Sequence, residues 1–163
     1  MWKNIPNWEN YQINELGEVK NIKTNKLIIG DINNAGYSRI CLYNNRFKQR
    51  FYRHRLVAEL FILNPNNLPE VNHIDGNKQN NYKTNLEWCS RIYNEREAHR
   101  LKLKEYKPFK VTFNNGIIKE YEFAIDFANE IKVTKRSVQN WLQNKNKGFL
   151  KREIKNIEYV LNE

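Results

Sequence analysis

The sequence has little cysteine and no long apolar run, and these absences exclude several classes of protein. Cys41 and Cys89 lie far apart, with no Cys-x-x-Cys pair, which excludes a disulfide framework and a four-ligand zinc knuckle. No apolar stretch is long enough to cross a bilayer. The first residues are polar and aromatic, unlike a charged segment that leads into an apolar signal core. We therefore expect a cytoplasmic protein that is not secreted and does not bind a membrane.

Positive charge is what the sequence has in excess. The chain carries 28 basic and 18 acidic residues, a formal net charge of +10, and the excess is distributed along its length. This charge makes nucleic acid the first partner class to consider, although ribosome-associated and membrane-binding basic proteins share it. With 163 residues, 40% of them hydrophobic and 13% aromatic, the chain can fold around a core. It is also rich in Asn, so a single amide is weak evidence of function.

The stretch Val71–Asn94 concentrates a histidine, several amides and a turn-forming acid. Val71–His73 is short and β-prone, Asp75–Asn77 is a turn signal, and Leu86–Cys89 is typical of a second strand. Ser90 is a favourable N-cap for the residues that follow. The pattern predicts a β-hairpin closed by a helix.

Residues 1–53 predict a β-rich module. Short strands are expected at Tyr11–Asn14, Glu18–Ile22 and Lys26–Ile29, and a hairpin is expected from Tyr37–Tyr43 and Arg46–Arg53 around Asn44-Asn45. In the last strand the two-residue period places Arg46, Lys48 and Arg50 on one face. Phe47 and Phe51 share the other face, which we expect to pack.

The cations of this strand have two interpretations. Three neighbouring positive charges repel one another unless an anion compensates them, which favours DNA contact by Arg46, Lys48 and Arg50, with Arg53 completing the set. The alternative is an ordinary solvated strand face.

Two helices are expected on either side of the central stretch. His54–Ile62 has the spacing of a core stripe and should end near Asn64-Pro65. His54 is either structural or a phosphate contact, and we favour the structural role. The second helix, from Ser90 to about Leu103, aligns Asn94 with two apolar residues, Ala98 and Leu101.

The second helix has two further features. Asn94 heads its apolar stripe, although an Asn there could simply satisfy a loop carbonyl. The other faces carry Arg91, Arg96 and Arg100, so the helix is a basic connector and a candidate DNA contact.

Residues 106–163 predict a third module. A hairpin is expected around Asn114-Asn115-Gly116, followed by two helices, the second with Thr134 as N-cap. Lys135, Arg136, Gln139 and Asn140 then face outward near the start of the last helix. This is how a helix-turn-helix presents side chains to base edges in a major groove, although an αα-hairpin with a polar exterior has the same apolar spacing.

Several motifs together resemble one family. The motifs are VNHIDGNKQNN (71–81), NLEW (85–88) and Asn94, preceded by 2–19 and His54-Arg55-Leu56-Val57-Ala58 and followed by 109–142. In this order they resemble the HNH homing endonucleases associated with phage introns. The resemblance implies an α+β fold with a ββα-metal (His-Me finger) nuclease core at residues 54–105, between a β-rich DNA-binding module (1–53) and a helix-turn-helix module (106–163).

The resemblance also implies roles for residues of the core. His73 would be the general base, and Asn85 would accept the other ring N–H of His73 and hold its tautomer. Asn72 and Asn94 would bind one divalent ion, Mg²⁺ or Mn²⁺, because these ions prefer hard oxygen ligands. Asn72 departs from a common pattern in which Asp precedes the histidine, so we expect the ion to arrive largely with DNA. Asp75 is expected to fix the turn instead of binding metal.

The function implied is a phage-encoded, site-specific homing endonuclease acting in a bacterial host. We expect a monomer that needs no protein partner and nicks one strand of double-stranded DNA by metal-dependent hydrolysis. The alternative is a catalytically decayed DNA-binding protein, either a regulator or an intron splicing helper. A ribosome-associated basic protein fits the charge but leaves the central motif unexplained.

Overall fold

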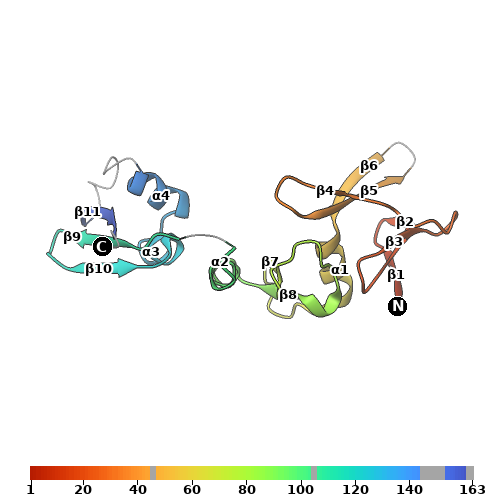
Figure 1. Cartoon of the computed structure of the whole chain (residues 1–163), viewed down its shortest axis with the longest axis horizontal. Coiled ribbons are helices and arrows are strands. Elements are labelled where there is room, and N and C mark those ends of the chain that lie inside the picture. Colours follow the sequence, from red (N-terminus) through yellow and green to blue (C-terminus); the bar gives the residue numbers. More distant parts are fainter. Residues whose placement is uncertain (45–46, 104–105, 144–152, 161–163) are drawn as a thin grey trace. The chain divides into compact units, whose positions relative to one another are not determined.

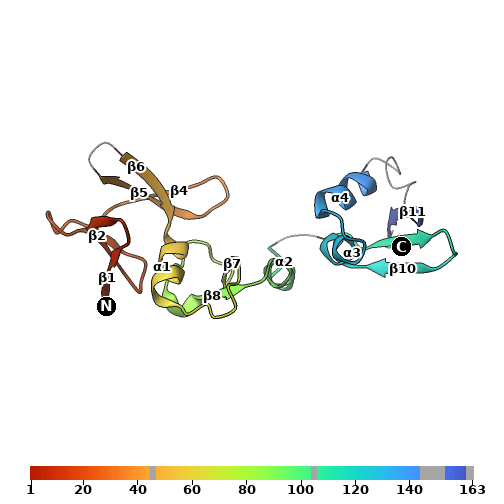
Figure 2. The same ribbon diagram turned by 180° about the vertical axis from the view of Figure 1, so that it is seen from behind.

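The computed structural model describes residues 1–44, 47–103, 106–143 and 153–160, and it divides into two compact units, Met1–Leu101 and Lys102–Glu163. Both units combine helices with antiparallel sheets (Figure 1, and Figure 2 from behind). The expected α+β class is therefore confirmed. In the described part of the chain, no helix has the length and apolar character needed to cross a membrane.

The first unit contains three small sheets, with strand orders β1-β2-β3, β4-β5-β6 and β7-β8. Its elements are β1 (Trp2–Ile5), β2 (Trp8–Asn14), β3 (Val19–Asn21), β4 (Asp31–Ile32), β5 (Ser38–Asn44), β6 (Phe47–Tyr52), α1 (Arg53–Phe61), β7 (Glu70–His73), η1 (Lys83–Asn85), β8 (Leu86–Cys89) and α2 (Arg91–Arg100). The expected hairpin of β5 and β6 and the expected helix α1 are both present.

One expected strand of the first unit is wrong. Lys26–Ile29 forms only an isolated bridge, between Leu27 and Lys20. Leu27 and Ile29 are exposed, and only Ile28 of this segment packs against the core. The sheets instead gain β1 and β4, which pair with β2 and β5.

The first 53 residues and the predicted nuclease core share one apolar core. Ile13 and Leu42, from the first part, are fully buried in the same cluster as Val57 of α1 and Leu86 of β8. The boundary expected at residue 53 therefore does not separate compact units, and a functional division there stays a prediction.

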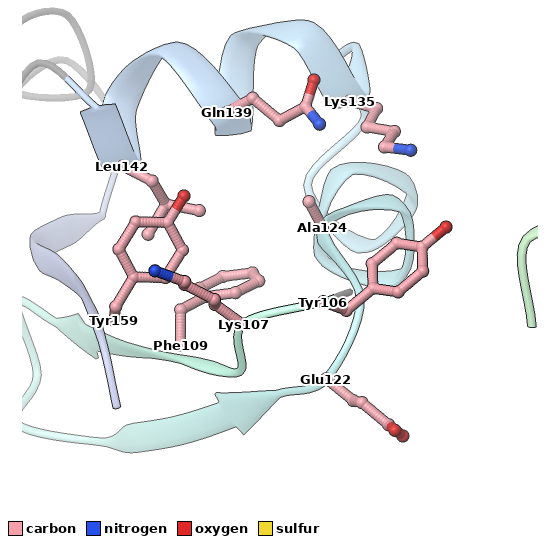
Figure 3. A pocket seen from close by; sticks show the side chains of 9 residues that line it. All are labelled: Tyr106, Lys107, Phe109, Glu122, Ala124, Lys135, Gln139, Leu142 and Tyr159. Atoms are coloured by element: carbon pink, nitrogen blue, oxygen red, sulfur yellow. The ribbon is translucent and has the colours of Figure 1, made fainter. Parts of the chain in front are cut away.

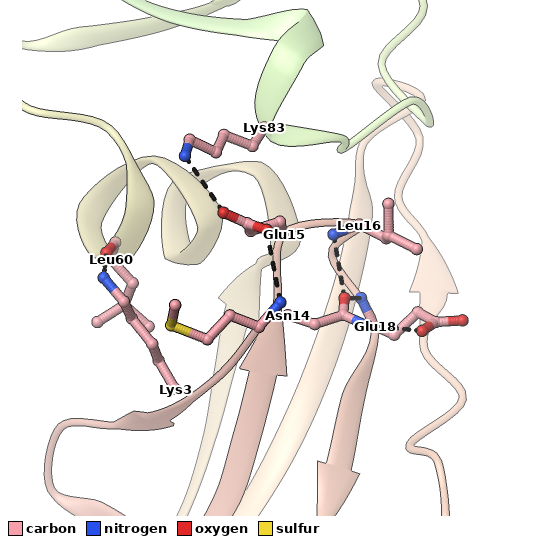
Figure 4. A network of polar contacts seen from close by, with 8 residues as sticks. Lys3, Asn14, Glu15, Leu16, Glu18, Leu60 and Lys83 are labelled. Carbon is pink, nitrogen blue, oxygen red and sulfur yellow. Dashed lines mark hydrogen bonds and ion pairs between the residues drawn. The ribbon is translucent and has the colours of Figure 1, made fainter.

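Polar contacts also tie the N-terminal strands to the core (Figure 4). Lys3 Nζ donates to the carbonyl of Leu60 in α1 at 2.6 Å, and Lys83 of η1 pairs with Glu15 at 3.2 Å. Gly17 has a φ of +80°, and a Cβ added there would lie 3.0 Å from the Cβ of Asn81. Glycine at this turn lets the N-terminal strands approach the loop that follows β7.

The second unit is a three-stranded sheet, of order β10-β9-β11, packed against two helices. Its elements are β9 (Phe109–Phe113), β10 (Ile118–Tyr121), α3 (Ala124–Glu130), α4 (Lys135–Gln143) and β11 (Ile154–Tyr159). Gly116, with a φ of +85°, forms the expected hairpin turn. Phe127 of α3 and Val138 of α4 are fully buried in the core. β11 was not expected; it pairs with the free edge of β9.

Candidate active site

The central stretch forms the expected hairpin closed by a helix. β7 and β8 pair in a register that places Asn72 opposite Glu87 and His73 opposite Leu86. Ser90 caps α2 as expected, because its Oγ accepts from the backbone N–H of Tyr93 at 3.2 Å. The ββα arrangement of the predicted core is therefore present (Figure 1).

The loop between β7 and β8 is held by Asp75 and Asn85. The carboxylate of Asp75 accepts from the backbone N–H of Asn77 at 2.8 Å, so its expected role in the turn is confirmed. Asn85 donates to Asp75 Oδ1 and to the carbonyl of Asn80, both at 2.9 Å. Its amide oxygen accepts from the backbone N–H of Asp75 at 3.1 Å.

These bonds correct the role expected for Asn85. Both ends of its side chain form hydrogen bonds inside the loop, and none of these bonds involves the ring N–H of His73. Asn85 belongs to the site as a residue that fixes the loop after His73, and no hydrogen bond to the His73 ring is found in the described residues.

His73 lies at the end of β7 and is only 5% exposed. Burial lowers the pKa of its imidazole, and the Asn81 amide opposes this shift. Its Nε2 and the Oδ1 of Asn81 are both buried, and neither has a hydrogen-bond partner in the described part of the chain. Asn81 Nδ2 donates to the carbonyl of Gln79 at 2.8 Å, which fixes the amide. Asn81 is thus the amide neighbour of the histidine, and in an Asn-rich sequence nothing distinguished it.

The His73 ring packs against residues from the first half of the unit. Its centroid lies 5.0 Å from that of His54 and 6.0 Å from that of Tyr37. Burial is the main cause that lowers the pKa of His54 to about 3, and electrostatic repulsion by His73 and Arg55 lowers it further. His54 is therefore a buried neutral ring, which supports the structural role favoured for it.

Asn72 and Asn94, the expected metal ligands, present amide oxygens. Asn72 is buried and its Nδ2 donates to Glu87 Oε1 at 2.8 Å, while no donor to its Oδ1 is found in the described residues. The Asn94 side chain, half-buried on α2, likewise has no hydrogen bond within the described ranges. The start of α2 is tied to β7 by the ion pair of Arg91 with Glu70, at 3.6 Å.

This donor set fits a hard divalent cation and does not fit zinc. Among the residues described, no group of three or more His, Cys, Asp and Glu side chains is placed to hold a metal. Amide oxygens with an adjacent carboxylate are ligands that Mg²⁺ or Mn²⁺ accepts when water and phosphate complete the shell.

The apolar stripe expected on α2 is only partly buried. None of the helix residues is buried, and Asn94, Ala98 and Leu101 are half-buried. Of the cations on this helix, Arg91 pairs with Glu70 and Arg100 pairs with Glu97 at 2.8 Å, while Arg96 is exposed. Exposed pairs of this kind are weak, so the cations can still exchange their partners for phosphate.

The cations expected to contact DNA from the last strand of the first module differ in their surroundings. Lys48 and Arg50 are exposed, as a DNA-contacting face requires, and Arg46 lies outside the described residues. Phe47 is 77% exposed, so only Phe51 of the expected packing face contacts the core, with its ring 5.6 Å from Trp8.

Arg53 is engaged inside the unit, which argues against its expected DNA contact. Its guanidinium donates to the carbonyls of Gly17 at 2.7 Å and Ile28 at 2.8 Å. Burial lowers its pKa. Arg53 therefore holds the β2–β3 turn and the segment after β3 against the start of α1.

Replacing Arg53 with alanine tests this reassignment. We expect a loss of about 1–3 kcal/mol in the free energy of unfolding, because two partly buried carbonyls lose their donor. Chemical denaturation followed by circular dichroism measures it. Arg50→Ala, at an exposed position of the neighbouring strand, is the control and should leave stability nearly unchanged. Equal stabilities, with weaker DNA binding for Arg53→Ala, would restore the original assignment.

The second unit carries the remaining candidates on α4. Thr134 caps this helix as expected, because its Oγ1 accepts from the backbone N–H of Ser137 at 3.1 Å. Arg136, Gln139 and Asn140 are exposed and Lys135 is half-exposed. Lys135 and Gln139 also line a pocket of about 490 Å³ with Tyr106, Phe109 and Tyr159 (Figure 3). The helix thus presents polar side chains from its first turns, as the sequence predicts for a recognition helix.

Comparisons with known proteins give a consistent result. The NUMOD4 motif matches residues 1–43. DNA endonuclease I-HmuI of Bacillus phage SP01 is 35% identical over 155 residues, covering 87% of this chain and 89% of that protein. An uncharacterized HNH endonuclease of Acanthamoeba polyphaga mimivirus, L245, is 34% identical over 145 residues, covering 88% of this chain but only 44% of the viral protein.

A solved structure extends the similarity to three dimensions. The structure concerns DNA binding and cleavage by the HNH homing endonuclease I-HmuI, and it matches this chain with a TM-score of 0.58 at 30% identity. The match covers 100% of this chain and 99% of that chain.

Proposed function

The chain belongs to the HNH homing endonuclease family, and from this premise we propose that it hydrolyses a phosphodiester bond of double-stranded DNA at a specific site. One observation supports this most: the β7–β8–α2 unit carries a buried neutral histidine and two amides, Asn72 and Asn94, whose oxygens have no hydrogen-bond donor in the described residues. We further propose that the protein acts as a monomer in the cytoplasm of a bacterial host, without a protein partner, and nicks one strand. A single core would have to reposition to reach the second strand.

His73 is the proposed general base. An imidazole whose pKa is lowered by burial is neutral near pH 7 and can take a proton from water. We assign the placement of its ring to the Asn81 amide and to packing against His54 and Tyr37. Asn85 acts one step away, through the loop.

Asn72 and Asn94 are the proposed metal ligands. A bound Mg²⁺ or Mn²⁺ would stabilise negative charge that develops on the phosphate and on the leaving oxygen. The amides contribute oxygen ligands without adding charge, so DNA phosphate completes the site.

Lys48 and Arg50 are proposed to bind phosphate from the N-terminal strands. Replacing both with Gln should reduce the slope of log binding constant against log salt by about 0.9 for each phosphate that is no longer neutralised. Fluorescence anisotropy with a labelled duplex at several salt concentrations measures the slope. Lys23→Gln with Lys26→Gln removes the same charge from another exposed segment and is the matched control. Equal slopes for the two double variants would exclude a specific role for β6.

Plasmid cleavage tests the proposed activity. Supercoiled plasmids carrying candidate intronless insertion sites are incubated with the full chain and Mg²⁺ or Mn²⁺, with EDTA as control. We expect nicked circles only when metal is present and only for some inserts. Plasmids that are bound but remain supercoiled with both metals would instead support the alternative, a DNA-binding protein that has lost its nuclease activity.

A further inference from the structure

Asn72 is held by a carboxylate from the neighbouring strand. Asn72 and Glu87 are direct antiparallel partners, so their side chains lie on the same face of the β7–β8 pair. Asn72 Nδ2 donates to Glu87 Oε1 at 2.8 Å. An amide has one donor end and one acceptor end, so this bond decides which end is free. With the nitrogen held by Glu87, the oxygen of Asn72 is the end left for a cation.

The negative charge of Glu87 has no cationic partner in the described part of the chain. The neighbouring carboxylate, Glu70, pairs with Arg91, whereas no Lys, Arg or His in the described ranges forms an ion pair with Glu87. Burial is the main cause that raises the pKa of the Cys89 thiol to about 12, and the negative charges of Glu87 and Glu70 raise it further. The partners of Glu87 are neutral, the Asn72 amide and the Tyr93 side chain, so they leave its negative charge uncompensated.

We propose that Glu87 is a positioning residue of the metal site: it orients the Asn72 oxygen and supplies, from the adjacent strand, the negative charge that an aspartate at position 72 would carry. This inference rests on the proposed function, because it assumes that Asn72 binds the divalent ion. It accounts for how a site with two neutral amide ligands attracts a hard cation.

Relocating the charge tests the proposal. Glu87→Gln keeps an acceptor for Asn72 and removes the charge, whereas Asn72→Asp combined with Glu87→Gln moves the charge to position 72. Mn²⁺ binding to the full chain is followed by electron paramagnetic resonance, with and without a synthetic duplex. We expect Glu87→Gln to weaken Mn²⁺ binding about tenfold, as loss of one screened unit charge near a dication implies. The double variant should recover most of that loss.

Glu70→Gln is the matched control, because it removes a carboxylate from the same strand pair whose charge is already paired. It should change Mn²⁺ binding much less than Glu87→Gln does. A thermal melt of each variant separates loss of folding from loss of metal, and the double variant keeps the test informative if Glu87→Gln is destabilised.

Two results would overturn the proposal while leaving the proposed function intact. One is a wild-type chain that nicks DNA while Glu87→Gln binds Mn²⁺ as the wild type does, which would make Glu87 a purely structural acceptor. The other is a double variant that binds as weakly as Glu87→Gln. A wild-type chain that neither binds Mn²⁺ nor nicks DNA would overturn the proposed function itself.

Discussion

Replacing His73 with alanine should lower the rate of strand cleavage by about 10²- to 10⁴-fold, the usual contribution of a positioned general base. His73 is the histidine at the end of β7, next to the proposed ligand Asn72 in the sequence, and burial keeps it neutral. DNA binding should change little, because the ring is nearly inaccessible. Single-turnover cleavage with saturating protein and Mg²⁺ measures the rate, and gel shift measures the binding.

The control for this variant is His99→Ala, on α2 outside the proposed site. It should cleave at nearly the wild-type rate. If His73→Ala cleaved as fast as the wild type, the assignment of the base would be wrong.

The pH dependence provides a second measure of the same assignment. A base with a lowered pKa stays deprotonated below the ordinary histidine value, so the acid limb of the rate profile should fall below about pH 6.5. Acid also favours unfolding, because the unfolded chain protonates His54 near pH 6.5 while the folded chain does so only near its pKa of about 3. Rates therefore have to be normalised to the folded fraction.

Replacing Phe127 with alanine should destabilise the second unit by about 3–5 kcal/mol, the usual cost of removing a buried aromatic ring. Phe127 is 0% exposed, and its ring centroid lies 4.8 Å from that of Tyr121 and 6.0 Å from that of Phe109. The apolar core of residues 109–157 shares no member with the core of the first unit. We therefore expect the unfolding transition of the second unit to move to lower denaturant while that of the first stays in place.

The matched control is Phe47→Ala, which removes the same side chain from an exposed position and should cost little. In the full chain, Phe127→Ala should also weaken discrimination among DNA sequences, because α4 packs on the same core through Val138 and Trp141. Metal-dependent nicking without sequence preference should persist. A single unfolding transition that shifts as a whole would show that the two units unfold together.

Much of the fold was predictable because its signals are local. The caps at Ser90 and Thr134 and the turn at Asn114–Gly116 each depend on neighbouring residues, and the structure confirms all three. β4 was missed because two residues are too few to show a pattern. β11 was missed because it forms by pairing with β9, which is distant in the sequence. Lys26–Ile29 has the composition of a strand, but it packs on the core only through Ile28 and forms a single bridge.

The residue types of the candidate site could be proposed from the sequence, whereas their contacts could not. Sequence pointed to His73, Asn72 and Asn94 as the chemical groups, but hydrogen-bond partners depend on geometry that spacing does not encode. Asn85 was expected at the histidine ring, but its side chain instead holds the loop. The amide beside the ring belongs to Asn81. Arg53 shows the same limit, because a charge pattern cannot reveal that a guanidinium is already bound to carbonyls.

The most direct test of the account is whether metal-dependent nicks made by this chain can be sealed by DNA ligase. Hydrolysis by water activated at His73, with the 3′ oxygen as leaving group, predicts nicked circles that appear only with Mg²⁺ or Mn²⁺ and that ligase closes again. Closure requires a 3′-hydroxyl next to a 5′-phosphate. The absence of nicks on every insert, nicks that form equally in EDTA, or nicks that ligase cannot close would contradict it.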